Sequence, residues 1–226
     1  MIFLRNLNRV QERINNAARR AGRLPEEIKL IAVTKTVPPE TIKEALNCGV
    51  NRFGENRVQE LILKYPELPP GTEWHLIGHL QTNKVKKIIG KVALIHSLDR
   101  WSLAEEISRV AIKNDIVARV LVQVNVAGEN TKHGLSLLEA EDFVSSVVPL
   151  PGLEVQGLMT IAPWTENPEE VRPVFRQLRE LAVRIKASKI GAHMEYLSMG
   201  MSGDFEVAVE EGANILRIGT ALFGKR

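Results

Sequence analysis

Apolar residues recur along this chain with two alternating periods. Short runs of consecutive apolar positions are typical of strands buried on both faces, whereas apolar residues that return every three or four positions are typical of helices. The clearest run is Leu-Ile-Ala-Val-Thr-Lys at 30–35, and the clearest helical stretch is 168–186, with Val171, Phe175 and Leu178 on one face. The pattern therefore predicts a chain that alternates strand and helix.

The alternation covers the whole length of 226 residues. It predicts strands at 30–35, 50–56 (running into a turn), 73–77, 92–96, 118–126, 153–159, 195–198 and 215–218. It predicts helices at 4–20, 38–46, 58–64, 82–89, 101–114, 137–148, 168–186 and 205–211. Strict alternation of this kind produces a parallel sheet.

Eight such units match an α/β fold of one particular kind, a (β/α)8 TIM-type barrel with an extra N-terminal helix. We expect this barrel to form a single domain over residues 1–226. An open doubly wound sheet is the alternative, but it usually carries a glycine-rich turn after its first strand. The stretch Thr-Lys-Thr-Val-Pro at 34–38 has no glycine, so the closed barrel is favoured.

Composition limits the classes of partner. Hydrophobic residues make up 44% and charged residues 25% of the chain, and the net charge of +3 comes from well-mixed positive and negative side chains. This balance slightly favours small anionic molecules and argues against nucleic acid. The single cysteine, Cys48, cannot form an internal disulfide and fits a reducing compartment. Charges begin too early for a signal peptide, and no apolar run approaches a membrane span, so we expect a cytoplasmic protein without a membrane partner.

Barrel enzymes place their chemistry at the carboxyl ends of the strands. Lys35 ends the first predicted strand, where we expect it to be partly desolvated and therefore a candidate amine nucleophile for a carbonyl group. The alternative is a lysine that extends from the strand end into water. Lys35 taken alone favours that alternative, so the other strand ends decide between the two.

The loops after the seventh and eighth strands are where barrels often bind phosphate. The seventh strand ends at Ser198 and its loop contains Ser202 and Gly203, while Gly219 and Thr220 follow the eighth strand. Glycines let backbone amides approach a phosphate closely, and hydroxyl groups add donors. The alternative is that these glycines are ordinary turn residues. Their place in the predicted barrel favours phosphate binding.

A lysine that faces a phosphate site across a barrel mouth indicates pyridoxal phosphate, whose aldehyde forms a Schiff base with lysine. Arg217 precedes Gly219 by two residues, so both point to the same side of the strand. A cationic arginine near the pyridine nitrogen keeps that nitrogen unprotonated and weakens the ring as an electron sink. The alternative for Arg217 is an ion pair with a carboxylate at the rim.

Six stretches spread over nearly the whole chain carry a resemblance. They are AVTKT at 32–36, GENRVQE at 54–60, WHLIGHLQTNK at 74–84, GLMTIAP at 157–163, SMGMSGD at 198–204 and RIGTALFG at 217–224. Through them the chain resembles the pyridoxal-phosphate homeostasis protein family, single barrels similar to the N-terminal domain of alanine racemase. The resemblance implies that Lys35 forms the Schiff base and that Arg217 faces the pyridine nitrogen.

The resemblance also implies the rest of the cofactor pocket. Ser202, Gly219 and Thr220 would hold the phosphate, and Asn56 and His79 would line the pocket. The other histidines have no spacing typical of metal ligands, so no metal is expected. The full set of candidate cofactor-binding residues is Lys35, Asn56, His79, Ser198, Ser202, Gly203, Arg217, Gly219 and Thr220.

Two functions remain open, a cofactor-binding protein and an amino-acid racemase. Racemisation by two bases needs an acid–base group on each face of the bound substrate. Lys35 could serve one face, and the candidates for the other are Tyr65, expected away from the rim, and Tyr196, expected too deep in its strand. The sequence therefore favours binding over catalysis.

The resemblance points in the same direction. Alanine racemases bring their second base from a partner subunit, in an assembly that uses an additional C-terminal domain. The sequence here ends at Arg226, directly after the last strand, so we expect a monomer with a solvent-accessible cofactor. The predicted function is pyridoxal 5'-phosphate homeostasis, meaning buffering of the cofactor or its delivery to apo-enzymes that use it. A pyridoxal-phosphate-dependent racemase is the alternative.

Overall fold

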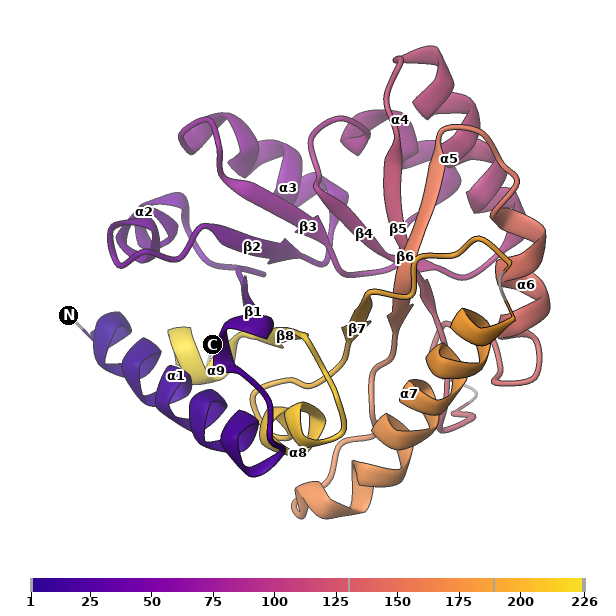
Figure 1. Cartoon of the computed structure of the whole chain (residues 1–226). Helices are drawn as coiled ribbons and strands as arrows, with labels where there is room; N and C mark the ends of the chain where they lie inside the picture. Colours follow the sequence, from indigo (N-terminus) through magenta and orange to yellow (C-terminus); the bar gives the residue numbers. More distant parts are fainter. Residues whose placement is uncertain (1, 130, 189, 225–226) are drawn as a thin grey trace.

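Eight parallel strands close into a barrel, because each pairs with the next in sequence and β8 also pairs with β1 (Figure 1). The computed structural model describes residues 2–129, 131–188 and 190–224. The strands are β1 (Lys29–Val33), β2 (Arg52–Glu55), β3 (Glu73–Leu76), β4 (Leu94–Leu98), β5 (Ala118–Gln123), β6 (Leu153–Met159), β7 (Tyr196–Ser198) and β8 (Ile215–Ile218). The predicted (β/α)8 TIM-type barrel is therefore confirmed.

Helices surround this barrel and include the extra helix expected at the N-terminus. The α-helices are α1 (Ile2–Arg20), α2 (Pro39–Asn47), α3 (Val58–Lys64), α4 (Val85–Ile88), α5 (Trp101–Lys113), α6 (Ala140–Val147), α7 (Arg172–Ala187), α8 (Phe205–Glu210) and α9 (Thr220–Phe223). Four short 3-10 segments, η1 to η4, lie at Pro25–Glu27, Tyr65–Glu67, Thr82–Lys84 and Pro168–Val171. No described helix combines the length and the apolar character needed to cross a bilayer.

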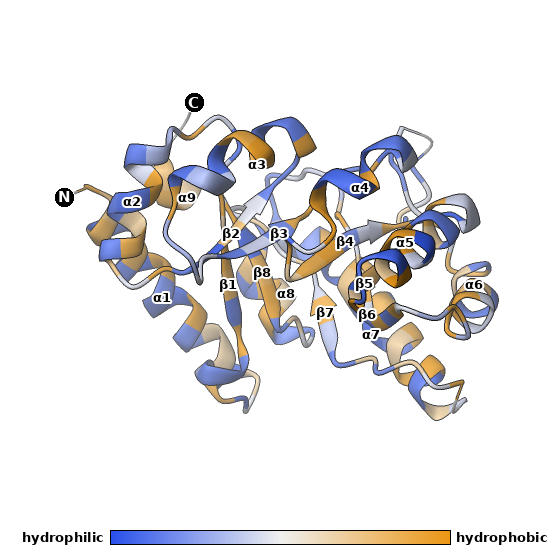
Figure 2. Ribbon diagram, turned by 90° about the horizontal axis from the view of Figure 1, so that it is seen from above, coloured by the Kyte–Doolittle hydropathy of each residue, from blue (hydrophilic) through white to orange (hydrophobic). Residues whose placement is uncertain are grey.

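Successive strand residues point to opposite sides of the barrel wall, which gives the protein two apolar layers. The outer layer packs the strands against the helices and contains most of the core, including Ala32 and Phe53. The inner layer fills the barrel and consists of Ile31, Leu94, Leu121, Met159 and Ile215. In Figure 2 hydrophobic and hydrophilic stretches alternate along the helices around the barrel, as expected of helices that bury one face.

Several element ends differ from the sequence prediction. The first strand stops at Val33 rather than Lys35, because the Val37 amide donates to the Thr34 carbonyl oxygen and closes a turn. Thr36 in this turn has a φ of 61°, which no strand residue adopts. The helix predicted at 82–89 is a 3-10 turn followed by the four-residue α4. Short segments like these carry too few periodic positions to be delimited from sequence.

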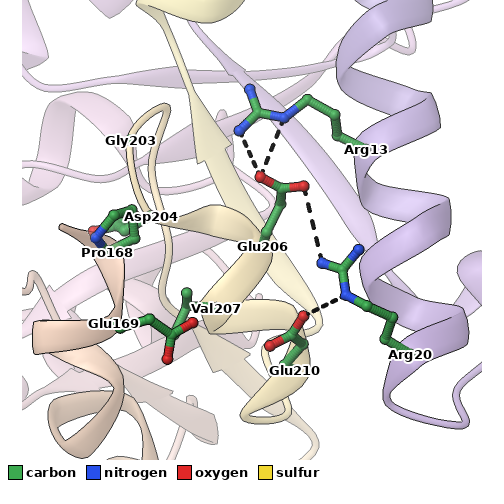
Figure 3. A pocket seen from close by; sticks show the side chains of 9 residues that line it. All are labelled: Arg13, Arg20, Pro168, Glu169, Gly203, Asp204, Glu206, Val207 and Glu210. Carbon is green, nitrogen blue, oxygen red and sulfur yellow. Dashed lines mark hydrogen bonds and ion pairs between the residues drawn. The ribbon is translucent and has the colours of Figure 1, made fainter.

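Ion pairs join the two ends of the chain on one side of the barrel (Figure 3). From α1, Arg13 pairs with Glu206 at 2.6 Å and Arg20 pairs with Glu210 at 2.8 Å. The Arg13 guanidinium also lies 4.6 Å from the centre of the Phe205 ring. Single exposed pairs contribute little, but a network of bidentate arginines fixes the orientation of both helices. Helix α8, which follows the candidate phosphate loop, is thereby held against α1.

Candidate functional site

Lys35 lies at the carboxyl rim of the barrel, two residues beyond β1. Lys35 is exposed to solvent, so the expectation that its side chain is partly desolvated is wrong. The reason is the turn described above, which ends the strand early and lifts residue 35 out of the barrel wall. The amine is therefore accessible to a ligand that enters from solvent.

Both neighbours of Lys35 are anchored from below by a buried ion pair. The Lys64 Nζ donates to the Thr34 carbonyl oxygen at 2.8 Å and to Glu55 Oε1 at 2.7 Å. The Thr34 hydroxyl donates to the same Glu55 oxygen at 2.6 Å. On the other side, the Thr36 amide donates to Glu60 Oε2, which also accepts from Lys64. The turn that presents the amine is thus held by charge-assisted hydrogen bonds, which are the strong class.

Glu55 is the most deeply buried acid of this anchor, with no exposed surface. Burial raises the pKa of Glu55, and the hydrogen bonds from Lys64 and Thr34 oppose that rise. Its second oxygen, Oε2, is buried and has no hydrogen-bond partner among the described residues. Such a group is tolerated only while its cation stays in place, so Glu55 and Lys64 depend on each other.

The predicted phosphate residues meet across the ends of β7 and β8. The Ser202 hydroxyl oxygen accepts a hydrogen bond from the Ala221 amide at 3.1 Å, which joins the seventh loop to the start of α9. Gly219 immediately precedes α9 and lies against β1, because a side-chain carbon there would be 3.5 Å from Val33 Cβ. Gly203 and Thr220 are exposed. The two loops therefore form one cup at the same rim as Lys35.

The cup offers unused donors. Within the described part of the chain, the backbone amides of Ser202, Gly203 and Thr220 have no hydrogen-bond acceptor. Gly203 also has open space around it, since a side-chain carbon would meet nothing within 4 Å. Gathered amide donors with no partner of their own are suited to an anion such as phosphate.

Arg217 lies inside the barrel beneath this cup and is 4% exposed. Its Nη1 donates to the Ser198 hydroxyl oxygen at 2.6 Å and its Nη2 donates to the Thr160 carbonyl oxygen at 2.8 Å. It forms no ion pair with a carboxylate of the described residues, unlike the alternative considered from sequence. Burial lowers the pKa of Arg217 to about 10, partly offset by the negative charge of Asp204, so the side chain stays cationic at neutral pH.

Ser198 does not face the cup. Its hydroxyl group is fully buried and lies between Arg217 and His96, with His96 Nδ1 at 2.9 Å. His96 is in turn 2.9 Å from His75. Among the histidines the sequence pattern selects only His79, and no linear motif connects residues 75, 96, 198 and 217. Their positions as inward-pointing residues on two pairs of strands that face each other across the barrel are the one signal that could have grouped them.

Asn56 and His79 line a separate hollow on the rim, of about 420 Å³. The hollow lies over the loops that follow β2 and β3, and Arg57 and Lys84 make it cationic. Both predicted residues are exposed. Gly78 brings them together, because a side-chain carbon at residue 78 would collide with the Asn56 carbonyl oxygen. A glycine is therefore required between the two loops.

His79, Asp99 and His133 lie close enough for a metal site, with ligand atoms within 4.8 Å of one another. The two imidazole rings, however, stack at 4.1 Å with an angle of 19°, so their lone pairs run parallel and do not converge. Asp99 Oδ1 is already paired with Arg100 at 2.6 Å. Burial and the neighbouring His133 lower the pKa of His79, which favours a neutral His79 ring in this stack. The cluster holds the loop after β5 against the rim.

These groups together suit a small carbonyl compound that carries a phosphate. Lys35 supplies an exposed amine, the cup supplies amide donors, and Arg217 supplies a buried cation whose direction is fixed by two hydrogen bonds. An amine attacks a carbonyl, amides bind phosphate, and a fixed guanidinium donates to a ring nitrogen. The residues present therefore fit pyridoxal phosphate.

Comparisons with known proteins point to the same cofactor. Residues 6–226 match the family described as alanine racemase, N-terminal domain. The chain is 55% identical over 221 residues to the pyridoxal phosphate homeostasis protein of Aquifex aeolicus, covering 97% of this chain and 96% of the relative. It is 41% identical over 226 residues to the protein of the same name from Escherichia coli strain K12, covering 98% and 95%.

A solved structure extends the comparison to three dimensions. PipY of Synechococcus elongatus PCC7942, solved with pyridoxal phosphate bound, superposes with a TM-score of 0.84 at 37% identity and covers 95% of this chain and 100% of PipY. The chain thus belongs to the pyridoxal phosphate homeostasis proteins, a family built on the alanine racemase N-terminal domain.

Proposed function

We propose that this protein binds pyridoxal 5'-phosphate through a Schiff base with Lys35 and buffers the cofactor or delivers it to apo-enzymes. Ser202, Gly203, Gly219 and Thr220 would hold the phosphate. PipY, which shares 37% of its residues with this chain, was solved with pyridoxal phosphate bound, and this supports the choice of cofactor. The names of the curated relatives support homeostasis as the role.

One observation carries the proposal, namely that the amine and the phosphate cup share one seam of the barrel. Strand β1 pairs with β8 through Ala32 and Ile218, directly below Lys35 and Gly219. A ligand whose phosphate occupies the cup therefore has its other end beside Lys35. Elsewhere on the rim, the hollow around Asn56 and His79 would contact the ligand or the molecules that exchange with it.

In this arrangement the residues around the bound cofactor have distinct roles. When bound, the cofactor supplies an aldehyde and a ring that can withdraw electrons. The Lys64–Glu55 anchor orients the turn that carries Lys35, and the amides of the cup bind the phosphate dianion. Arg217 donates toward the ring nitrogen and, being permanently cationic, keeps that nitrogen unprotonated. A ring held in this form is a weak electron sink, which suits storage better than catalysis.

The positions of the two tyrosines favour a carrier over a racemase. The Tyr196 hydroxyl lies 2.8 Å from Lys29 Nζ, at the amino end of the barrel opposite to Lys35. Tyr65 lies in a 3-10 turn after α3 and is exposed on the outside. Neither tyrosine reaches the second face of a cofactor at the rim. We accordingly infer a carrier that acts as a monomer in the cytoplasm, whose partners are apo-enzymes of pyridoxal phosphate.

The test is an absorption spectrum of the purified protein with added pyridoxal phosphate, before and after borohydride. The expected result is a visible band that bleaches on reduction, with the reduced adduct located on the Lys35 peptide by mass spectrometry. A protein that stays colourless, or an adduct on another lysine, would overturn the proposal. Chirally resolved amino-acid assays on the loaded protein then separate the carrier from the racemase.

A further inference from the structure

Five polar side chains form a continuous row through the inside of the barrel. The row runs from Glu73 and His75 on β3, through His96 on β4 and Ser198 on β7, to Arg217 on β8. The separations are 3.0 Å from Glu73 Oε1 to His75 Nε2, 2.9 Å from His75 Nδ1 to His96 Nε2, and 2.9 Å from His96 Nδ1 to Ser198 Oγ. Arg217 Nη1 completes the row at 2.6 Å from Ser198 Oγ.

The row connects the two ends of the barrel. Glu73 begins β3 and therefore lies at the amino end, whereas Arg217 lies near the carboxyl end that carries the cup. Strands β4 and β7 are not neighbours, so the contact between His96 and Ser198 crosses the interior. His96 and Ser198 have no exposed surface, and His75 is 3% exposed. The hydrogen bonds of the row must therefore be satisfied by its own members.

Burial determines which atom donates at each step. Arginine only donates, so Ser198 Oγ accepts from Arg217 and its hydroxyl hydrogen is free to donate to His96 Nδ1. Burial, followed by the charges near His96, holds the pKa of His96 well below its usual range, so this ring carries one proton. That proton is on Nε2 and is donated to His75 Nδ1. His75 then donates from Nε2 to Glu73, and every donor points away from Arg217.

A second proton on His75 reverses this direction. A doubly protonated His75 donates from both nitrogens, so His96 Nε2 must accept and the His96 proton must move to Nδ1. Ser198 Oγ then receives hydrogen bonds from both His96 and Arg217. The Ser198 hydroxyl hydrogen must then rotate away from His96, and it has no other acceptor among the described residues. Proton uptake at one end of the barrel thus changes the hydrogen bonding of Arg217 at the other, with only this hydroxyl rotating.

Polar groups from three other strands, two of them charged, surround the lower end of the row. Glu73 also accepts from Arg52 of β2 at 3.2 Å, and Lys29 of β1 lies close enough to act on its charge. Lys29 is in turn held by the hydroxyl group of Tyr196 from β7. The hydrogen bond from His75 lowers the pKa of Glu73 against the effect of burial, so the row ends on a carboxylate at neutral pH. At the other end, Asp204 acts on Arg217 by its charge.

We propose that Glu73, His75, His96 and Ser198 are positioning residues for Arg217, and that they couple cofactor retention to proton uptake by His75. The second half of this inference rests on the proposed function, because it requires Arg217 to face the cofactor ring. When His75 carries a second proton, Ser198 Oγ accepts from both His96 and Arg217, and its hydrogen bond to Arg217 becomes weaker. Retention should therefore fall as His75 becomes protonated, and by linkage the bound cofactor opposes that protonation.

The direction in which the hydrogen bonds of the row are donated can be measured on the wild-type protein. Long-range proton–nitrogen spectra of 15N-labelled protein report the tautomer of each histidine, with His75→Gln and His96→Gln variants used only to assign signals. At about pH 8 we expect both rings protonated on Nε2, and at any lower pH at which His75 has taken up a second proton we expect His96 protonated on Nδ1. A His96 ring that is already protonated on Nδ1 at the higher pH, or that keeps its tautomer when His75 is protonated, would overturn the inference.

The coupling to the cofactor is tested by the pH profile of pyridoxal phosphate affinity. Wild-type protein should lose more affinity on acidification than His75→Gln, which cannot take up the proton. His193→Gln, which removes an exposed histidine paired with Glu154 on the outside, should keep the wild-type profile. If reduction still locates the adduct on Lys35 but all three profiles coincide, the coupling fails and the proposed function stands. If no adduct forms at any pH, both fail.

Discussion

Lys64 Nζ lies 2.8 Å from the carbonyl oxygen of Thr34, the residue directly before Lys35. A buried ammonium group on α3 thereby fixes the backbone that presents the exposed amine on the neighbouring turn. Its charge is balanced by Glu55, whose carboxylate belongs to the end of β2. Lys35 is thus positioned by a second, buried lysine.

Replacing Lys64 by methionine should lower the free energy of unfolding by about 3–5 kcal/mol. The reason is that Glu55 would remain buried without its cation. The double variant Lys64→Met with Glu55→Gln should recover part of this loss, because it removes the stranded charge. Urea unfolding measures both, with Lys43→Met on the exposed face of α2 as a control that changes stability by less than about 0.5 kcal/mol. A double variant no more stable than the single one would show that the pair is not coupled.

Lys35→Ala should abolish covalent attachment of pyridoxal phosphate and leave the fold intact. Lys35 is exposed and lies outside β1, so its side chain contributes little to the core. Absorption after addition of the cofactor, borohydride reduction and circular dichroism measure the two effects. Lys113→Ala, an exposed lysine at the end of α5, should retain the visible band. A reducible adduct that survives in Lys35→Ala would place the Schiff base on a different lysine.

Thr220→Val should weaken cofactor retention about ten- to hundredfold. One hydrogen bond to a charged partner contributes about 1.5–3 kcal/mol, and the valine keeps the shape of the side chain while removing its donor. Equilibrium dialysis against pyridoxal phosphate gives the affinity. Thr41→Val, in α2 and away from the cup, serves as the matched control. Equal affinity of Thr220→Val and wild type would mean that the phosphate lies elsewhere.

Acid should destabilise the protein partly through Glu211. Burial raises the pKa of Glu211, but hydrogen bonds from Arg176 and Arg172 outweigh this effect and hold the net pKa below its ordinary value of 4.5. The unfolded chain therefore binds this proton more readily. Glu211 contributes its full stabilisation above pH 4.5, and this contribution is lost as the pH falls through the lower folded value.

Urea midpoints at about pH 7 and about pH 3.5 test this assignment. Glu211→Gln should be less stable than wild type at the higher pH and should lose less stability on acidification. Glu105→Gln, on the exposed side of α5, should follow the wild type at both values. Parallel acid profiles for wild type and Glu211→Gln would assign the acid sensitivity to other carboxylates.

The sequence predicts the barrel well because its signal is periodic and repeated eight times. Helices of four residues are different: α9 at Thr220–Phe223 is not among the predicted helices, and α4 is half as long as expected. The rim residues Lys35 and Thr220 could be selected because parallel strands place all their carboxyl ends at one edge. That rule gives their place along the barrel but does not give their exposure.

The supporting interactions could not be predicted, because they exist only once the barrel closes. Lys64 resembles an ordinary basic residue in the last turn of an amphipathic helix, yet it is buried against Glu55. His75 and His96 are in contact although 21 residues separate them, and His96 contacts Ser198 across the interior. Such contacts depend on how side chains pack in the folded barrel, and neither hydrophobic period nor motif spacing encodes them.

The pairing of Arg13 with Glu206 has a consequence for the newly made protein. These residues are 193 positions apart, and at about 5–20 residues per second a ribosome needs about 10–40 s to reach the second after the first. During that interval the apolar face of α1, with Val10, Ile14 and Ala17, is not yet covered by α8. The growing chain therefore exposes the apolar face of α1 from its first helix onward, and that face is covered only after α8 has been made.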